Sequence, residues 1–295
     1  MPPGHPTDAR RAALLMLGSV AVFSLMDAGL KTLSAHYPPF QVAALRGASS
    51  LPLVLAWALA TSGPRALLRV RWPLHLLRGV LGIVMMASFV YALRTLPLST
   101  AYSIFFVAPL LITALSVPIL GERVGPRRWS AIAVGLAGVL VVLRPGGEGM
   151  LTLAGLAVLL AAFGYAVSAI TVRVLARTDS TQAITFWLLA LMALGAGALA
   201  APGWVPLRGE HFAIIAGIGL AGALGQWSIT EAFRRGEASM IAPLEYSALV
   251  WGLLLDLTLW GVLPDGITWL GAGIIVASGL YLLRRERVHA EAEHP

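Results

Sequence analysis

The sequence contains no cysteine and few charged side chains. Of its 295 residues, 21 are Lys or Arg and 14 are Asp or Glu, so only 12% of the chain is charged. A soluble domain is typically about one-quarter charged, and this composition is instead typical of a membrane protein. The lack of cysteine excludes disulfides, thiolate catalysis and zinc–sulfur sites.

Two kinds of catalytic motif are also missing. No Gly-x-x-x-x-Gly-Lys-Ser/Thr loop occurs, so ATP does not drive the chain through such a loop. The six histidines all lie in the termini, between apolar runs or at the ends of those runs: His5, His36, His75, His211, His289 and His294. The apolar runs therefore hold no histidine in their interior for a buried Ser–His dyad or a His-based metal site. We expect no catalytic residue, no metal and no cofactor.

Long apolar runs dominate the chain, which is 58% hydrophobic with a mean hydropathy of +0.82. A helix rises about 1.5 Å per residue, so roughly 20 residues cross the hydrocarbon core of a bilayer. Ten runs of that length occur, at 12–33, 40–61, 74–94, 98–119, 127–144, 152–173, 181–201, 211–233, 238–261 and 267–284. The sequence therefore predicts an all-α membrane protein with ten transmembrane helices.

The basic residues predict how these helices are oriented. With the N-terminus in the cytoplasm, sixteen of the 21 Lys and Arg fall on the inside. Only Lys31, Arg94, Arg144 and Arg208 fall on the outside, and Arg46 lies within a run. The positive-inside rule then places both termini in the cytoplasm, in a bacterial-type inner (plasma) membrane. Because the basic residues form no stripe or tail, we expect the lipid bilayer and not nucleic acid as a partner.

The second half of the chain repeats the first when position 231 is aligned with position 91. YALRTLPLSTAYSIFFVAPL at 91–110 then lies over EAFRRGEASMIAPLEYSALV at 231–250, and Phe23 and Trp129 meet Phe163 and Trp269. We therefore predict two repeats, 1–145 and 146–295. Each holds five runs, an odd number, so the second begins on the opposite side of the membrane. Such inverted repeats are common in carriers that work by alternating access.

Residues 90–145 carry a family resemblance. VYALRTLPLSTAYSIFFVAPLLITALSVPILGERVGPRRWSAIAVGLAGVLVVLRP resembles the EamA domain of the drug/metabolite transporter superfamily, through Pro109, Leu-Gly-Glu-Arg at 120–123 and Trp129. The second copy is similar, so the resemblance covers nearly the whole chain. It implies a ten-helix carrier that exports metabolites, with a central cavity lined by helices 1, 3, 4, 6, 8 and 9.

The second copy departs from this pattern at Gly261-Val262, where Gly-Glu would often stand. Glu122, in the first copy, therefore has no counterpart. We expect it to act locally, by capping or by pairing with Arg123, Arg127 or Arg128.

Asp27 is the most unusual residue of the first run, because a charge inside a membrane helix is costly. It shares a helix face with Ser24 and Lys31. Arg46 lies at a similar depth in the next, antiparallel run. One interpretation is a structural ion pair of Asp27 with Arg46, with Lys31 reaching the outer headgroups. In the other, Asp27 lines the cavity and holds a substrate ammonium or exchanges a proton.

The ninth run holds two further carboxylates, Glu245 and Asp256. They stand eleven positions apart, about three helical turns, and so share a face. Pro243 suits a helix start or local unwinding near Glu245. Glu245 is either a functional carboxylate or a side chain that reaches the cytoplasmic surface.

Aromatic rings complete the predicted lining, because they make a cavity apolar yet able to hydrogen-bond. Most aromatic residues in membrane helices serve packing or the interface, so we expect about half of the aromatic candidates to line the cavity. The full candidate set is Ser24, Asp27, Tyr91, Tyr102, Phe105, Tyr165, Trp227, Glu245 and Tyr246.

These observations predict a secondary transporter that exports small metabolites by alternating access through a central cavity. Amino acids are the substrates that we favour. An exporter of hydrophobic cationic drugs is the alternative within transport. A membrane enzyme that depends on carboxylates alone is the alternative outside it, and detection of a product would identify it. A duplicated chain already holds both halves of a pathway, so it can work as a monomer.

Overall fold

The structure is a computed structural model that describes residues 6–122, 125–143, 152–236, 241–274, 276–278 and 281. The regular elements within these residues are all helical, and none is a strand. In the first half they are α1 (Pro6–Ser34), α2 (Pro39–Thr61), α3 (Pro64–Leu68), α4 (Trp72–Leu93), α5 (Leu98–Phe105), α6 (Val107–Leu120) and α7 (Pro126–Leu143). These bounds agree closely with the predicted runs.

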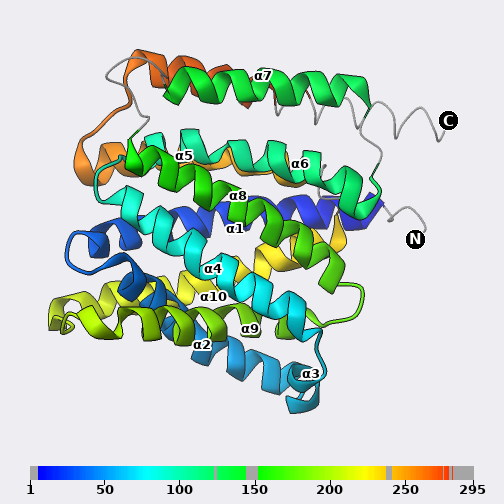
Figure 1. The fold of residues 1–295 in the computed structure, drawn as a ribbon, viewed down its shortest axis with the longest axis vertical. Coiled ribbons are helices and arrows are strands. Elements are labelled where there is room, and N and C mark those ends of the chain that lie inside the picture. Colours follow the sequence, from blue (N-terminus) through cyan, green and yellow to red (C-terminus); the bar gives the residue numbers. More distant parts are fainter. Residues whose placement is uncertain are drawn as a thin grey trace.

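The second half contains α8 (Leu153–Leu175), α9 (Thr181–Ala200), η1 (Ala201–Gly203), η2 (Gly209–His211), α10 (Phe212–Arg235), η3 (Ala242–Ser247), α12 (Ala248–Leu255) and η4 (Asp256–Trp260). Among the described residues, seven helices are long and apolar enough to cross a membrane. Shorter apolar helices occur at Trp129–Gly138 and Gly266–Ser278. The helices lie side by side along one direction, with α7 at one edge (Figure 1). The chain is therefore a multi-pass membrane protein.

Two helices that contribute to the centre of the bundle are interrupted where prolines lie. Pro109 has no N–H and its ring clashes with the carbonyl of Phe105, so the helix breaks at Phe106, between α5 and α6. Near Pro243 the backbone forms the 3₁₀ turn η3, which contains Glu245. The local unwinding predicted near Glu245 is thus confirmed.

The packing of the two halves follows an exchange pattern. The repeat alignment, which lays position 231 over position 91, carries α1 onto α8, α2 onto α9 and α4 onto α10. The structure packs α1 against α10 and α4 against α8. The repeat alignment carries the first of these contacts onto the second, because α8 corresponds to α1 and α10 corresponds to α4. The structure also packs α2 against both α9 and α10, and α4 against α9. The sequence repeat therefore corresponds to a repeat in the packing.

Glycines allow the two halves to approach closely. A Cβ on Gly47 of α2 would lie 2.7 Å from the backbone nitrogen of Ala193 in α9. A Cβ on Gly219 of α10 would lie 2.7 Å from the backbone oxygen of Ser49 in α2. Backbone contacts of this kind require a residue without a side chain, as is common between membrane helices.

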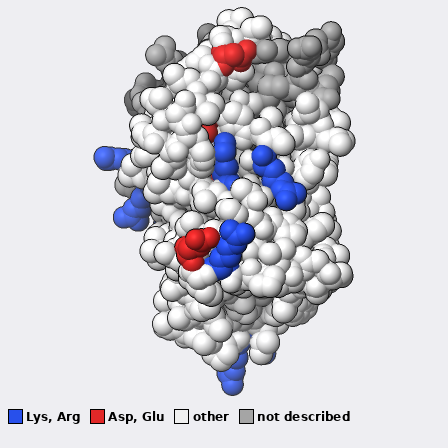
Figure 2. Space-filling model, turned by 90° about the vertical axis from the view of Figure 1, so that its left-hand side faces the viewer, with Lys and Arg blue, Asp and Glu red and all other residues white. Residues whose placement is uncertain are grey.

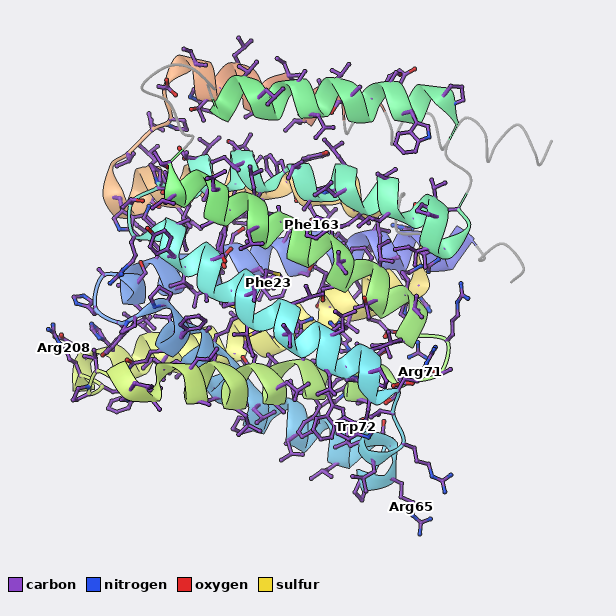
Figure 3. All side chains as sticks on the ribbon, in the orientation of Figure 1. Phe23, Arg65, Arg71, Trp72, Phe163 and Arg208 are labelled. Carbon is purple, nitrogen blue, oxygen red and sulfur yellow. The ribbon has the colours of Figure 1, made fainter. Side chains whose placement is uncertain are left out.

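Basic side chains distinguish the two ends of the bundle. Arg65 and Arg71 lie at one end, hereafter the basic end, and Arg208 lies at the opposite end (Figure 3). The N-terminal end of α1 also lies at the basic end (Figure 1). Viewed from the opposite end, the charged side chains are few, and an acidic and a basic group lie in contact (Figure 2).

Asp179 joins the turn between α8 and α9 to α4 at the basic end. Its Oδ2 lies 2.8 Å from His75 Nε2 and accepts a hydrogen bond of 3.1 Å from the Arg71 amide, and its Oδ1 accepts one of 2.6 Å from Thr178. Burial alone would raise the pKa of Asp179, but these hydrogen bonds together lower it below its usual value. The ionised form is therefore the one that the fold stabilises.

We expect Asp179→Asn to lower the free energy of unfolding by about 1–3 kcal/mol at neutral pH, because it removes these charged hydrogen bonds. A lowered pKa in the folded state gives stability above the unfolded pKa and loses it as pH falls through the folded one. The difference between wild type and variant should thus shrink on acidification below the usual range of aspartate. Thermal unfolding in detergent at several pH values measures it. Glu210→Gln, whose parent side chain is 67% exposed, is the control and should change stability little.

Candidate functional site

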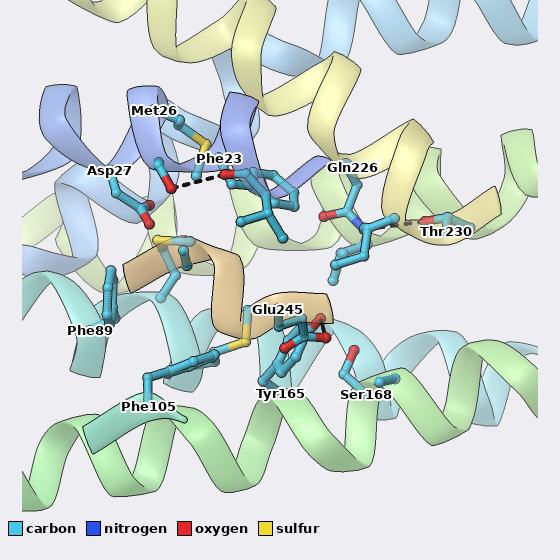
Figure 4. Close-up of a pocket in the computed structure, with 18 of the residues that line it drawn as sticks. Phe23, Met26, Asp27, Phe89, Phe105, Tyr165, Ser168, Gln226, Thr230 and Glu245 are labelled. Carbon is cyan, nitrogen blue, oxygen red and sulfur yellow. Dashed lines mark hydrogen bonds between the residues drawn. The ribbon is translucent and has the colours of Figure 1, made fainter. Parts of the chain in front are cut away.

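A cavity lies in the middle of the bundle, between the two halves. It is lined by residues of α1, α4, α5, α8, α10 and η3, together with Phe106, Ala248, Arg46 of α2 and Leu188 of α9. These elements include all of the helices that the family resemblance implies. The space open to the centre of a water-sized molecule is about 160 Å³. Figure 4 shows Asp27, Tyr165 and Gln226 around this space.

Two carboxylate–tyrosine pairs occupy the cavity wall. Tyr102 of α5 donates a hydrogen bond of 2.8 Å to Asp27 of α1. Tyr165 of α8 donates one of 2.8 Å to Glu245 of η3 (Figure 4). Under the repeat alignment, α1 and α5 exchange with α8 and the segment that contains η3. The two halves thus present equivalent pairs, with the acid and the phenol on exchanged helices.

The basic side chain of Arg46 also lines the cavity and is only 3% exposed. Its two Nη atoms contact Met192 Sδ and Gln226 Oε1, each at 3.5 Å, and its Nε has no hydrogen-bond partner in the part of the chain that the structure describes. Gln226 in turn donates to Thr230 at 3.3 Å, which directs its oxygen toward the guanidinium. Buried cations are normally paired, so this one is suited to an anionic ligand.

Arg78 of α4 is a second buried guanidinium in the wall, with 2% exposure. Its Nη1 donates to the carbonyl of Ile184 at 2.9 Å and its Nε to Ser168 at 3.3 Å. Within the described residues, neither Arg78 nor Arg46 makes an ion pair with a carboxylate. The cavity therefore combines two acids held by tyrosines with two arginines that make no direct ion pair among the described residues.

The structure brings most of the predicted lining together. Six candidates lie in the cavity wall, namely Ser24, Asp27, Tyr102, Phe105, Tyr165 and Glu245. Phe105 also packs against Tyr165, with ring centroids 5.4 Å apart. The polar and aromatic residues predicted from separate helices therefore converge on one space.

Three candidates lie elsewhere, because their helical phase turns them away. Tyr91 is 41% exposed on the outside of α4, about half a turn from the lining residue Phe89. Trp227 follows the lining residue Gln226 and is 38% exposed on another face of α10. Tyr246 follows Glu245 and is buried outside the cavity lining, where its hydroxyl has no hydrogen-bond partner among the described residues.

Asp27 and Arg46 line the same cavity without a direct ion pair. Asp27 is oriented toward Tyr102 of α5, whereas Arg46 is oriented toward Met192 of α9 and Gln226 of α10. The predicted structural pair is therefore not a direct ion pair: each side chain contacts other helices, although the two opposite charges attract each other.

Lys31 turns inward and does not reach outward as predicted. Its Nζ lies 3.5 Å from Asp256 Oδ1 and 4.7 Å from the ring centroid of Trp260. Asp256 is fully buried and accepts hydrogen bonds from the amides of Leu98 and Ser99 at 3.0 and 2.7 Å. Asp256 therefore satisfies the first amides of α5 and neutralises Lys31, and it lies outside the cavity wall.

A second ion pair joins the halves nearer the basic end. Glu122, just after α6, lies 3.8 Å from Arg173 of α8. Of the local partners predicted for Glu122, Arg123 and the side chains of Arg127 and Arg128 lie outside the described residues. The repeat alignment relates α1 to α8 and η4 to the end of α6. The Arg173–Glu122 pair thus joins regions that correspond to those joined by Lys31–Asp256, although the four residues do not occupy aligned positions.

Several lining residues escape prediction from the sequence. The orientation count treats Arg78 as one of the basic residues on the inside. It lies within the run 74–94, however, and is buried in the structure. Gln226 and Thr230 carry a usable signal, since two polar residues spaced by four share one face of an apolar helix. Met85, Met86 and Phe89 carry no signal, because apolar residues that line a cavity look like any others.

The cavity extends toward the basic end of the bundle. Its lining on α1 stops at Asp27, well before the end of α1 at Ser34, whereas its lining on α10 reaches Phe233, close to Arg235. Beyond Asp27 lies the Lys31–Asp256 cluster. A polar cavity between two related sets of membrane helices is typical of secondary transporters. The fold and cavity thus define a small-molecule membrane transporter.

The chain belongs to the EamA-like transporter family, which matches residues 10–144 and 152–284, one copy for each half. It is 30% identical to the riboflavin transporter of Vibrio cholerae, covering 98% of this chain and 97% of that protein. It is 28% identical to the pseudopaline exporter CntI of Pseudomonas aeruginosa, covering 94% and 98%. The relationship places the chain in the drug/metabolite transporter superfamily.

Two further comparisons agree with this family. The S-adenosylmethionine uptake transporter of Rickettsia prowazekii is 28% identical over 94% of this chain and 93% of that protein. A solved crystal structure aligns with 93% of this chain and 98% of its own, with a TM-score of 0.70 and 24% identity, which supports the fold. The relatives are transporters of small molecules, not enzymes.

Proposed function

We propose that the chain is a secondary transporter that exports small zwitterionic metabolites, amino acids in particular, by alternating access. The observation that carries the proposal is the paired chemistry of one buried cavity. Arg46 and Arg78 supply guanidinium groups that make no direct ion pair within the described part of the chain, and Asp27 and Glu245 supply carboxyl groups. A ligand with both a carboxylate and an ammonium complements such a wall.

The relatives support a substrate of this kind without deciding it. S-adenosylmethionine, the substrate in one relative's name, is a derivative of the amino acid methionine. Another relative is named as an exporter, and its substrate differs from both riboflavin and S-adenosylmethionine. The family thus carries varied metabolites in both directions, so the residues of this cavity are the better guide to the substrate.

The side chains of the cavity wall also favour a zwitterionic substrate over a cationic drug. A hydrophobic cationic drug would suit the aromatic rings and the two acids, but it would meet Arg46 and Arg78 in the same space, and like charges repel there. An enzyme that uses carboxylates alone would differ from relatives that are all transporters. Zwitterion transport accounts for both the acids and the arginines.

We propose a ten-helix topology of two inverted repeats, 1–145 and 146–295, with both termini in the cytoplasm. The exchanged packing of α1 with α10 and α4 with α8 supports the repeats. The gathering of arginines at the basic end, including Arg65 and Arg71, supports the orientation in a bacterial-type inner membrane (Figure 3). In this proposal one chain holds the whole cavity and works as a monomer.

Two ion pairs on either side of the cavity support the proposal of alternating access. Lys31–Asp256 ties α1 to η4 on the outer side of the cavity, and Arg173–Glu122 ties α8 to the end of α6 near the basic end. We propose that one pair breaks as the other closes, while the site stays fixed between them. A cavity that extends toward the basic end is then open to loading from the cytoplasm.

Uptake by proteoliposomes that hold the purified protein tests the function. We expect saturable, competable flux of some labelled amino acids without an imposed ion gradient. Asp27→Asn and Glu245→Gln should each reduce it by about 10-fold or more, because each removes a carboxyl group that we propose binds the substrate. The control variant Glu210→Gln should keep wild-type flux.

Two results would contradict the proposal. One is saturable flux of a hydrophobic cation with none of any amino acid, which would favour the drug exporter. The other is the absence of amino-acid flux even with an imposed pH gradient. If both carboxylate variants transport normally but unfold at lower temperature, Asp27 and Glu245 are structural.

A further inference from the structure

A second cleft lies at the basic end of the bundle, on the face of α10 that turns away from the central cavity. It is lined by α1, α2, α9 and α10, and it offers about 530 Å³ to the centre of a water-sized molecule. Gln226 and Thr230 of α10 line the cavity, whereas Trp227 and Glu231 line the cleft. The cleft is therefore separate from the transport site.

Three arginines and one acid give the cleft a positive charge. Glu231 binds Arg235 at 2.6 Å, lies 3.8 Å from Arg234 and accepts a hydrogen bond of 2.6 Å from Thr181. Arg234 also donates to Thr181 at 3.0 Å. These contacts hold both guanidinium groups at the cleft, and Glu231 is the one acidic side chain among the described residues that line it. Arg11 of α1 is exposed and adds a further positive charge.

Apolar and aromatic side chains form the rest of the wall. Leu14 is 60% exposed and Trp227 is 38% exposed, and Trp57 and Leu15 complete this part. Tryptophan is enriched where membrane helices meet the headgroup layer, and arginines beside it face the phosphates of that layer. The cleft thus offers a cationic pocket next to a surface that suits an acyl chain.

We propose that this cleft binds the headgroup phosphate of an anionic phospholipid. Arginine forms bidentate hydrogen bonds with phosphate, and basic pockets between membrane helices on the cytoplasmic side are suited to such headgroups. The exposed leucine and tryptophan favour a lipid over a soluble phosphate, because a soluble anion gains nothing from them. Bound there, the lipid contacts α1, α2, α9 and α10 together.

Quenching of tryptophan fluorescence by brominated lipid tests the proposal. The protein is reconstituted in phosphatidylcholine with a small, equal fraction of either brominated phosphatidylglycerol or brominated phosphatidylcholine. We expect stronger quenching by the brominated phosphatidylglycerol, and the double variant Trp57→Phe/Trp227→Phe should lose this excess. Arg11→Gln, which removes an exposed side chain, should reduce the excess by about half or more.

Arg65→Gln is the matched control, because Arg65 lies at the same end outside the cleft and should leave the excess unchanged. Equal quenching by the two brominated lipids would overturn the proposal, as would an equal loss in the control. Removal of the excess by soluble glycerol phosphate would identify a free-phosphate site instead. The measurement needs no transported substrate, so its failure is distinguishable from a failure of the proposed transport.

Discussion

Replacing Arg46 with glutamine is expected to raise the half-saturating concentration of an amino-acid substrate by about 10- to 100-fold, because a buried charge-assisted contact is worth about 1.5–3 kcal/mol. Arg46 is buried and lines the cavity, and its guanidinium makes long contacts to Met192 and Gln226 at 3.5 Å and lies 5.8 Å from the ring centroid of Phe23. A substrate carboxylate would give this guanidinium its missing partner. Initial uptake rates over a range of substrate concentrations measure the change.

The decisive control changes the substrate. An amino-acid methyl ester keeps the ammonium group but lacks the carboxylate, so its transport should respond weakly to Arg46→Gln. Arg46→Lys keeps the charge without the planar fork, and we expect an intermediate loss. If the free acid and the ester lose affinity equally, Arg46 does not bind the carboxylate. A drop in unfolding temperature in that case would assign it a structural role.

The architecture could be predicted well because bilayer physics constrains it. Runs of about 20 apolar residues must be helices, since no water satisfies the backbone of the chain in hydrocarbon. The bounds of α2 and α4 at 39–61 and 72–93 therefore fall close to the predicted 40–61 and 74–94. Proline disfavours the helix interior, so Pro243 also indicated a helix start or local unwinding near Glu245.

The partners of the charged residues could not be predicted in the same way. Depth along a helix follows from the sequence, and this suggested that Asp27 pairs with Arg46. The direction in which a side chain faces depends on which helices are neighbours. Lys31 pairs with Asp256, which lies in the other half of the chain, and Asp27 with Tyr102. Such contacts become visible only once the two halves are packed.

The environment of Arg78 could not be predicted from its position in the sequence either. Its place near the start of a run suggested a solvated charge at the cytoplasmic side. In the structure the carbonyl of Ile184 and the hydroxyl of Ser168 hold it inside the bundle. The positive-inside rule counts residues near helix ends and does not show which of them turn inward. A residue that supports the orientation can therefore also line the site.

Asp256→Asn is expected to destabilise the folded protein by about 3–5 kcal/mol, because it breaks a buried ion pair and leaves Lys31 without its partner. Asp256 accepts hydrogen bonds from two amides and from the Ser99 hydroxyl, the last at 2.6 Å. An asparagine amide would place N–H groups where one of these acceptors stood. Thermal unfolding in detergent should show the loss.

A double-mutant cycle separates the charge from the hydrogen bonds. Lys31→Met alone leaves Asp256 ionised without its cation, whereas the double variant removes both charges. We expect the double variant to be more stable than the sum of the single losses predicts, because the two charges depend on each other. Strictly additive losses would mean that the 3.5 Å contact contributes nothing.

The same substitution should also alter access to the cavity. The chain has no cysteine, so Ser24→Cys in the cavity wall would carry the only thiol. If Lys31–Asp256 closes the outer side, Asp256→Asn should speed labelling of that thiol by an impermeant reagent from outside. Arg173→Gln, which breaks the related pair near the basic end, should slow it, because opening one side favours closure of the other. Acceleration by both variants would indicate general loosening and contradict the proposal of two alternating closures.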